Sequence, residues 1–213
     1  MIKKSFKSLQ SKNSNLSGFT LVEILVVISI LAIVGVIFTE IFFRSLRGSN
    51  QAQIINKIKQ EGQNALSSID RDIRSADNIL CPNVSSGQML GVSDILVTEK
   101  DGKYTRYLLK PSTTQANSAI QQDYPQESDF ASKEEFKTRI CLGEQTTNAV
   151  FLTDNNLKTG VSIKGEGIFT REIKAGQKDF VTVSFQVTPG NESPQTASEN
   201  LDPVLFQTTI GLR

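Results

Sequence analysis

The stretch GFTLVEILVVISILAIVGVIF, residues 18–38, decides how this chain is organised. Phe19 to Phe38 is an apolar run of 20 residues, about the length that crosses roughly 30 Å of hydrocarbon. The residues before it hold no acid and four lysines, Lys3, Lys4, Lys7 and Lys12. Because positive charge stays on the cytoplasmic side, the sequence predicts a cytoplasmic N-terminus and an exported remainder.

Two features distinguish this start from an ordinary secretory signal. The well-placed small residue, Gly18, comes before the apolar run, so cleavage there would leave the hydrophobic segment on the mature protein. Glu23 lies inside the run, where an ionised acid at a helix centre costs about 2.5–3.5 kcal/mol in lipid and less near the interface. A plain signal anchor that tolerates Glu23 near the interface is one interpretation.

A more specific interpretation rests on Gly18-Phe19-Thr20-Leu21-Val22-Glu23. This motif, after a basic leader and before an apolar run, resembles the class III leader of type IV pilins, GFTLxE. The resemblance implies that prepilin peptidase cuts after Gly18 and methylates the new amine of Phe19. It also implies that Glu23 meets the N-terminal ammonium of a neighbouring subunit, because a buried carboxylate is tolerated when it meets a cation.

The resemblance further implies the partners and the location of the chain. The partners are other pilin or pseudopilin subunits, prepilin peptidase, an inner-membrane assembly platform and the lipid bilayer. The protein would wait in the inner membrane as a single-pass protein and then enter an extracellular or periplasmic filament. Glu23 argues against the outermost tip, where no subunit above offers an amine.

Beyond the apolar run the pattern becomes that of an amphipathic helix. Apolar residues recur at steps of three and four, with Gly62 filling one gap: Ile55, Ile58, Ala65, Leu66, Ile69, Ile73, Ala76 and Leu80. Asp70 and Arg74 form an i,i+4 pair off this stripe. No proline occurs in 19–80, which predicts one helix with a membrane and assembly part, 19–43, and an amphipathic part, 44–80. The alternative is two helices broken near residues 48–50.

From residue 81 onward the sequence predicts an antiparallel β-sheet headpiece, and with the helix an α+β fold. Residues 181–188 and 206–212 alternate with a period of two. Asp101-Gly102 marks a hairpin turn, and further strands are expected near 148–153 and 161–171. The polar stretches 111–135 and 189–203 are expected to be surface loops.

Two further features bear on which kind of pilin the chain resembles. The segment ALSSIDRDIRSADNI (65–79) and the ending LFQTTIGLR resemble the branch that holds the W-type minor pilins and J-type minor pseudopilins. Major pilins commonly carry a proline in the outer half of the membrane helix, and this chain has none there. The resemblance therefore favours a minor pilin or pseudopilin, with a major pilin as the alternative.

The two cysteines, Cys81 and Cys141, lie in the exported part, where oxidation is possible. Cys81 is expected at the end of the helix and Cys141 just before a strand, so a bridge would join helix to sheet. Two buried thiols are the alternative. Residues 154–160 resemble a calcium loop, but Lys158 stands where a ligand would be needed, so a turn is expected.

Composition limits the remaining functions. The chain has no histidine, which excludes Ser-His-Asp and Cys-His catalysis and His-ligated metal sites. The net charge of +1 and the lack of a basic-aromatic patch indicate no direct nucleic-acid site, and no cofactor is expected. The alternatives to a non-enzymatic filament subunit are an anchored ligand-binding domain that does not polymerise and a tethered carboxylate hydrolase.

Overall fold

The structure is a computed structural model, and it describes residues 18–84, 89–143, 148–174, 176, 178–194 and 201–212. The chain divides into two compact units, residues 1–46 and 47–213. The first unit holds the start of a long helix, and the second holds the rest of that helix and every strand of the described residues. The predicted leader, apart from Gly18, lies outside the described residues.

Helix α1 (Leu21–Ser75) is continuous through Gly48, so the predicted single helix is confirmed and the alternative of a break at residues 48–50 is wrong. It ends five residues before the predicted end at 80. The backbone N–H of Asp77 donates to the Glu99 carbonyl at 2.8 Å, and the Asp77 carboxylate accepts the N–H of Asp101 at 2.9 Å. These bonds turn the chain into a strand, β1 (Asn78–Cys81), in place of the last helical turn.

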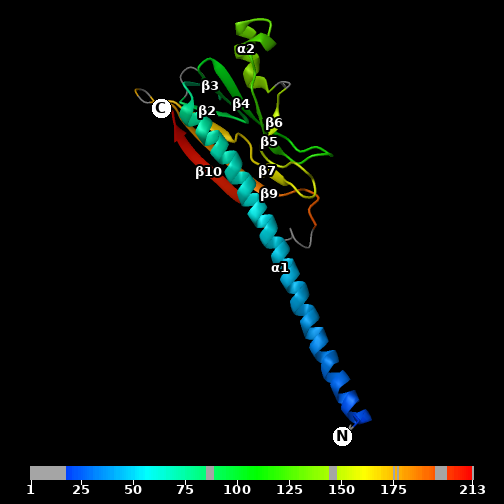
Figure 1. Ribbon diagram of the computed structural model, residues 1–213. Coiled ribbons are helices and arrows are strands. Elements are labelled where there is room, and N and C mark those ends of the chain that lie inside the picture. The colour runs from blue at the N-terminus through cyan, green and yellow to red at the C-terminus, as the bar shows by residue number, and fades with distance from the viewer. Residues whose placement is uncertain are drawn as a thin grey trace, which may run out of the picture. The chain divides into compact units, whose positions relative to one another are not determined.

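Two antiparallel sheets follow α1. The first sheet has the order β1-β3-β4-β5-β6, and the second has the order β10-β9-β8-β2, with β7 also paired to β9. Their bounds are β2 (Leu90–Ser93), β3 (Ile95–Lys100), β4 (Lys103–Lys110), β5 (Ala119–Asp123), β6 (Val150–Phe151), β7 (Val161–Lys164), β8 (Phe169–Glu172), β9 (Phe180–Pro189) and β10 (Val204–Gly211). The predicted α+β fold, a long helix packed on antiparallel sheets, is confirmed (Figure 1).

The main core lies between α1 and both sheets. In α1 the buried residues follow the predicted stripe: Ile58, Gly62, Ala65, Ile69 and Ile73. The second sheet contributes the inward residues of β9, which alternate as predicted: Val181, Val183, Phe185 and Val187. Each large apolar side chain buried in this way stabilises the headpiece by about 1.5–3 kcal/mol.

Gly62 has a packing role that the sequence pattern did not show. A Cβ built at Gly62 would lie 2.4 Å from ring carbons of Phe206, and the Phe206 ring stacks on Phe185 at a centroid distance of 5.7 Å. The glycine therefore lets the β10 aromatic ring approach the helix backbone.

Gly62→Ala is accordingly expected to destabilise the headpiece by about 1–3 kcal/mol through overpacking, although alanine is the better helix former by about 1 kcal/mol. Thermal unfolding of the full chain in detergent, followed by near-ultraviolet circular dichroism, measures this. Gly48→Ala is the control, because a Cβ there meets no atom within 4 Å. Equal or higher stability of Gly62→Ala would contradict the packing.

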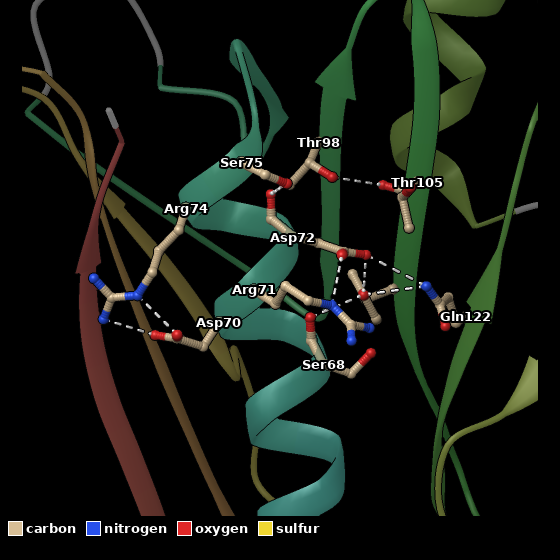
Figure 2. Close-up of polar contacts among 10 residues, drawn as sticks. Ser68, Asp70, Arg71, Asp72, Arg74, Ser75, Thr98, Thr105 and Gln122 are labelled. Atoms are coloured by element: carbon tan, nitrogen blue, oxygen red, sulfur yellow. Dashed lines mark hydrogen bonds and ion pairs between the residues drawn. The ribbon is translucent and has the colours of Figure 1, made fainter.

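Polar contacts fix α1 to the first sheet. The Tyr107 hydroxyl donates to Asp72 Oδ2 at 2.6 Å and accepts from Gln122 Nε2 at 3.2 Å. Burial, followed by the hydrogen bond to Asp72, raises the pKa of Tyr107 well above its ordinary value, so the phenol stays a donor. Figure 2 shows Asp72 and Gln122 directed toward each other, and the predicted Asp70–Arg74 pair on another side of the helix.

The prediction of loops was wrong for residues 111–135. This stretch contains β5, the 3₁₀ turn η1 (Glu127–Asp129) and the start of helix α2 (Lys133–Arg139). Strand β5 lies between β4 and β6, and Gln121 and Asp123 are buried in it. Because polar side chains occupy buried positions, β5 lacks the apolar alternation that identifies a strand.

Three other stretches can be compared with the predictions. The strand expected at 161–171 is in fact two strands, β7 and β8, separated by residues that include Gly165 and Gly167 at positive φ. In the stretch 189–203, residues 190–194 and 201–203 form no helix or strand, and residues 195–200 lie outside the described residues. The strand expected near 148–153 is short, Val150–Phe151.

A second, smaller core covers the other face of the first sheet. It contains Val97 of β3, Phe136 of α2, and Ile140 of the 3₁₀ turn η2 (Ile140–Leu142). Cys81 and Cys141 form a disulfide there with a Cα–Cα distance of 5.9 Å. Because the helix ends at residue 75, the bridge joins β1 to η2 and not α1 to a sheet. Closing a loop of this length stabilises by about 4 kcal/mol in the chain-entropy model.

Candidate processing and assembly site

Thr20 caps the N-terminal end of α1, a role that was not predicted from the sequence. The Thr20 hydroxyl oxygen accepts the backbone N–H of Glu23 at 3.2 Å, and the Thr20 carbonyl accepts the N–H of Ile24 at 3.2 Å. Thr20 is thus an N-cap, since its side chain satisfies a donor that has no partner within the helix. The sequence signal was present: Thr-x-x-Glu before an apolar run is the capping-box pattern.

Glu23 lies in the first turn of α1. An acid at this position also interacts favourably with the helix dipole, by about 0.3–1 kcal/mol at an exposed site. The Glu23 carboxylate has no hydrogen-bond partner among the described residues. A local role at the helix start therefore accompanies the assembly role that the sequence resemblance implies, and an experiment on Glu23 must separate the two.

The apolar segment presents its side chains outward. In the first unit Phe19 is 77% exposed and Ile33 is 65% exposed. Among the residues that the structure describes, α1 is the one helix long and apolar enough to cross a membrane. The Ser29 and Thr39 hydroxyls each donate to the carbonyl four residues earlier, at 2.8 Å, so these polar groups are satisfied inside the helix, as lipid requires.

The fold does not require a glycine at position 18. A Cβ built at Gly18 would meet no atom within 4 Å, and its φ is not in the left-handed region. Within the described residues, then, neither packing nor backbone strain selects glycine. The small residue next to Phe19 is consistent with recognition by another molecule.

Residues 13–39 match the family model described as the prokaryotic N-terminal methylation motif. This match supports a type IV pilin-like family. It covers Gly18, Phe19 and Glu23 together with the whole apolar run 19–38, and the headpiece lies outside it. No curated protein and no solved structure matches the chain.

The motif supports a pilin-like or pseudopilin substrate of prepilin peptidase, which fits an apolar N-terminal helix anchored in the inner membrane. The type IV pilin-like family is structural and not enzymatic. Among the described residues no group of three or more His, Cys, Asp or Glu side chains is placed to hold a metal ion.

The headpiece carries an open hollow of about 870 Å³ beside the β3–β4 turn. Its lining includes Asp101 and Glu127, but the Glu127 carboxylate accepts a hydrogen bond from the Tyr104 hydroxyl at 3.0 Å. Burial and this bond raise the pKa of Tyr104. Lys100 and Lys103 also line the hollow, so its mixed charges indicate no ligand class and give no support to a carboxylate hydrolase.

Proposed function

We propose that the chain is a minor pilin or pseudopilin of a type IV filament system. The observation that carries the proposal is the methylation motif at residues 13–39, which leads directly into a helix with an exposed apolar surface. In this proposal the protein performs no chemistry. It is cut between Gly18 and Phe19, methylated on Phe19, held in the membrane, and drawn into a helical assembly through residues 19–43.

Cleavage prepares the assembly contact. Removal of residues 1–18 creates an ammonium group on Phe19, four residues before the Glu23 carboxylate. Positions i and i+4 lie on one helix face, so each subunit offers a cation and an anion on the same side. A neighbour shifted along the helix axis can pair its ammonium with Glu23 in a dry interface, where each charge offsets the desolvation of the other.

Two observations support a minor subunit with an exported headpiece. No proline interrupts the chain between Phe19 and Cys81, in contrast to the helix common in major pilins. The disulfide between Cys81 and Cys141 fits an oxidising compartment outside the cytoplasm. We therefore place the N-terminus in the cytoplasm, the headpiece outside the inner membrane, and the mature subunit in a periplasmic or extracellular filament.

Gly18→Leu tests the processing step. The wild-type chain should lose its leader only in cells that contain a prepilin peptidase, and Gly18→Leu should keep it, because a bulky side chain crowds the scissile bond. Electrophoretic mobility of a C-terminally tagged chain, with and without the peptidase, measures this. Gly35→Leu is the matched control, since a Cβ at Gly35 also meets no atom within 4 Å, and it should be processed normally. Equal processing of Gly18→Leu and wild type would refute the proposed cleavage site.

A further inference from the structure

A small pocket lies between α1 and the loops that follow β6 and β9, and its lining includes the apolar residues Ile54, Val161 and Pro194. Its volume is about 260 Å³. It lies wholly in the second unit, and its lining residues that carry polar side chains are Asn50, Gln53, Lys57, Lys158, Thr159 and Ser193. Among the residues that the structure describes, lysines, amides and hydroxyls line this pocket together with the apolar side chains, and no acidic residue does.

The loop side of the pocket is held by a network of hydrogen bonds. The Asn156 side-chain oxygen accepts the backbone N–H of Lys158 at 2.9 Å and that of Thr159 at 3.1 Å. The Ser193 hydroxyl donates to the Lys158 carbonyl at 3.0 Å. A Cβ at Gly160 would lie 2.4 Å from the Asp154 carbonyl, so the turn also closes tightly there. Lys158 is therefore carried on an ordered turn.

The helix side is fixed by an ion pair between Lys57, which lines the pocket, and Asp154, which does not. Lys57 Nζ lies 2.5 Å from Asp154 Oδ2, and the hydrogen bond from Lys57 lowers the pKa of Asp154. The Asp154 N–H donates to Glu61 at 3.1 Å. With Lys57 engaged, the Lys158 ammonium has no carboxylate partner among the described residues. Further donors come from the side chains of Asn50, Gln53 and Thr159. These side chains form no hydrogen bond with any of the residues that the structure describes.

We propose that this pocket binds a phosphate group. An ammonium beside neutral hydrogen-bond donors, with no carboxylate among the described residues of the lining, is complementary to a small anion. The group can belong to free phosphate or to a phospholipid head. Asn50 lies seven positions after Phe43, the end of the predicted membrane segment, on the continuous helix α1. At the helical rise per residue this is about 10 Å, so a lipid head is within reach of Asn50. The site does not depend on filament assembly.

The test uses the full chain in maltoside micelles, which contain no phosphate. Inorganic phosphate is titrated at constant ionic strength, and NMR follows the Gly160 backbone amide and the side-chain amides of Asn50 and Gln53. A parallel titration adds a short-chain phosphatidylglycerol, and a third adds the corresponding phosphatidylcholine. Lys158→Gln should weaken the response at least about fivefold, as expected for a lost charge-assisted hydrogen bond. Lys178→Gln, which removes an exposed lysine outside the pocket, should not change it.

Each outcome decides the proposal. Saturating shifts with inorganic phosphate support it and identify free phosphate as sufficient. Shifts with either lipid but not with inorganic phosphate support it with a lipid head as the source, and phosphatidylcholine then reports whether net negative charge is needed. Absence of saturating shifts in all three titrations overturns it. An equal loss of the titration response in Lys158→Gln and Lys178→Gln also overturns the proposal, because that result indicates attraction by overall charge.

Discussion

Glu23→Gln is expected to leave membrane insertion and cleavage at Gly18 at wild-type levels and to remove the protein from filaments. In the proposed assembly, the Glu23 carboxylate pairs with the Phe19 ammonium of a neighbouring subunit. Removing one member of a buried pair costs about 3–5 kcal/mol, because the other charge is left without a partner. At 1.4 kcal/mol for each factor of ten, incorporation should fall by at least about a hundredfold.

The choice of glutamine separates this role from the local role at the helix start. A glutamine three residues after Thr20 keeps the capping-box pattern and loses only the charge. Glu23→Gln and Glu23→Ala should therefore fail equally in assembly. Thr20→Ala, which removes the observed N-cap bond at 3.2 Å and keeps the charge, should still assemble.

A second acid of the same helix provides the matched control. Glu40 Oε2 lies 4.0 Å from Arg44 Nη2 in an exposed i,i+4 pair, and such pairs contribute little to stability. Glu40→Gln should enter filaments as wild type does. The measurement is the ratio of protein in sheared filaments to protein in the membrane pool. Normal incorporation of Glu23→Gln would show that the charge has no part in assembly.

The second large effect is expected in the headpiece, at the buried pair of Arg106 and Asp123. Arg106 is 0% exposed and Asp123 is 1% exposed. Two bonds join them, Nε to Oδ1 at 2.9 Å and Nη2 to Oδ2 at 2.6 Å, and Arg106 Nη1 donates to the Ile140 carbonyl at 3.1 Å. The arginine thus links β4, β5 and η2, next to the disulfide at Cys141.

Asp123→Asn should destabilise the headpiece by about 3–5 kcal/mol, because it leaves a buried guanidinium without its counter-charge. Urea unfolding of fragment 47–213, with the disulfide intact, measures the loss. The double variant Arg106→Met with Asp123→Leu should recover most of the stability, since replacing a buried pair by apolar groups is often neutral. A loss below about 1 kcal/mol for Asp123→Asn would contradict the importance of the pair. A fragment that fails to fold as wild type would contradict the headpiece assignment itself.

Patterns with a single physical cause could be predicted from the sequence. Strands β9 and β10 each bury one face, so their residues alternate, and the buried stripe of α1 recurs at helical spacing. The hairpin turn at Asp101-Gly102 was also predictable, because Asp-Gly is preferred where a turn needs positive φ at both central residues. In the structure these φ angles are 50° and 71°. The apolar run was recognisable by length alone.

Features that depend on distant partners could not be predicted in this way. Strand β4 is buried on both faces, with Arg106 on one and Tyr107 on the other. The charged Arg106 does not indicate a buried strand position until Asp123 is known to lie opposite it. Residues 78–81 continue the helical pattern, yet Asp77 bonds to β3 and the helix stops. The Thr20 cap, by contrast, is a local pattern that could have been found.

The most direct test of the central claim is mass spectrometry of the N-terminus of the protein extracted from membranes that contain a prepilin peptidase. The sequence from Gly18 to Glu23 and the match at residues 13–39 both lead to this terminus. The account predicts a chain that begins at Phe19 and carries a methyl group on its α-amine. A chain that still begins at Met1 in the presence of an active peptidase would contradict it.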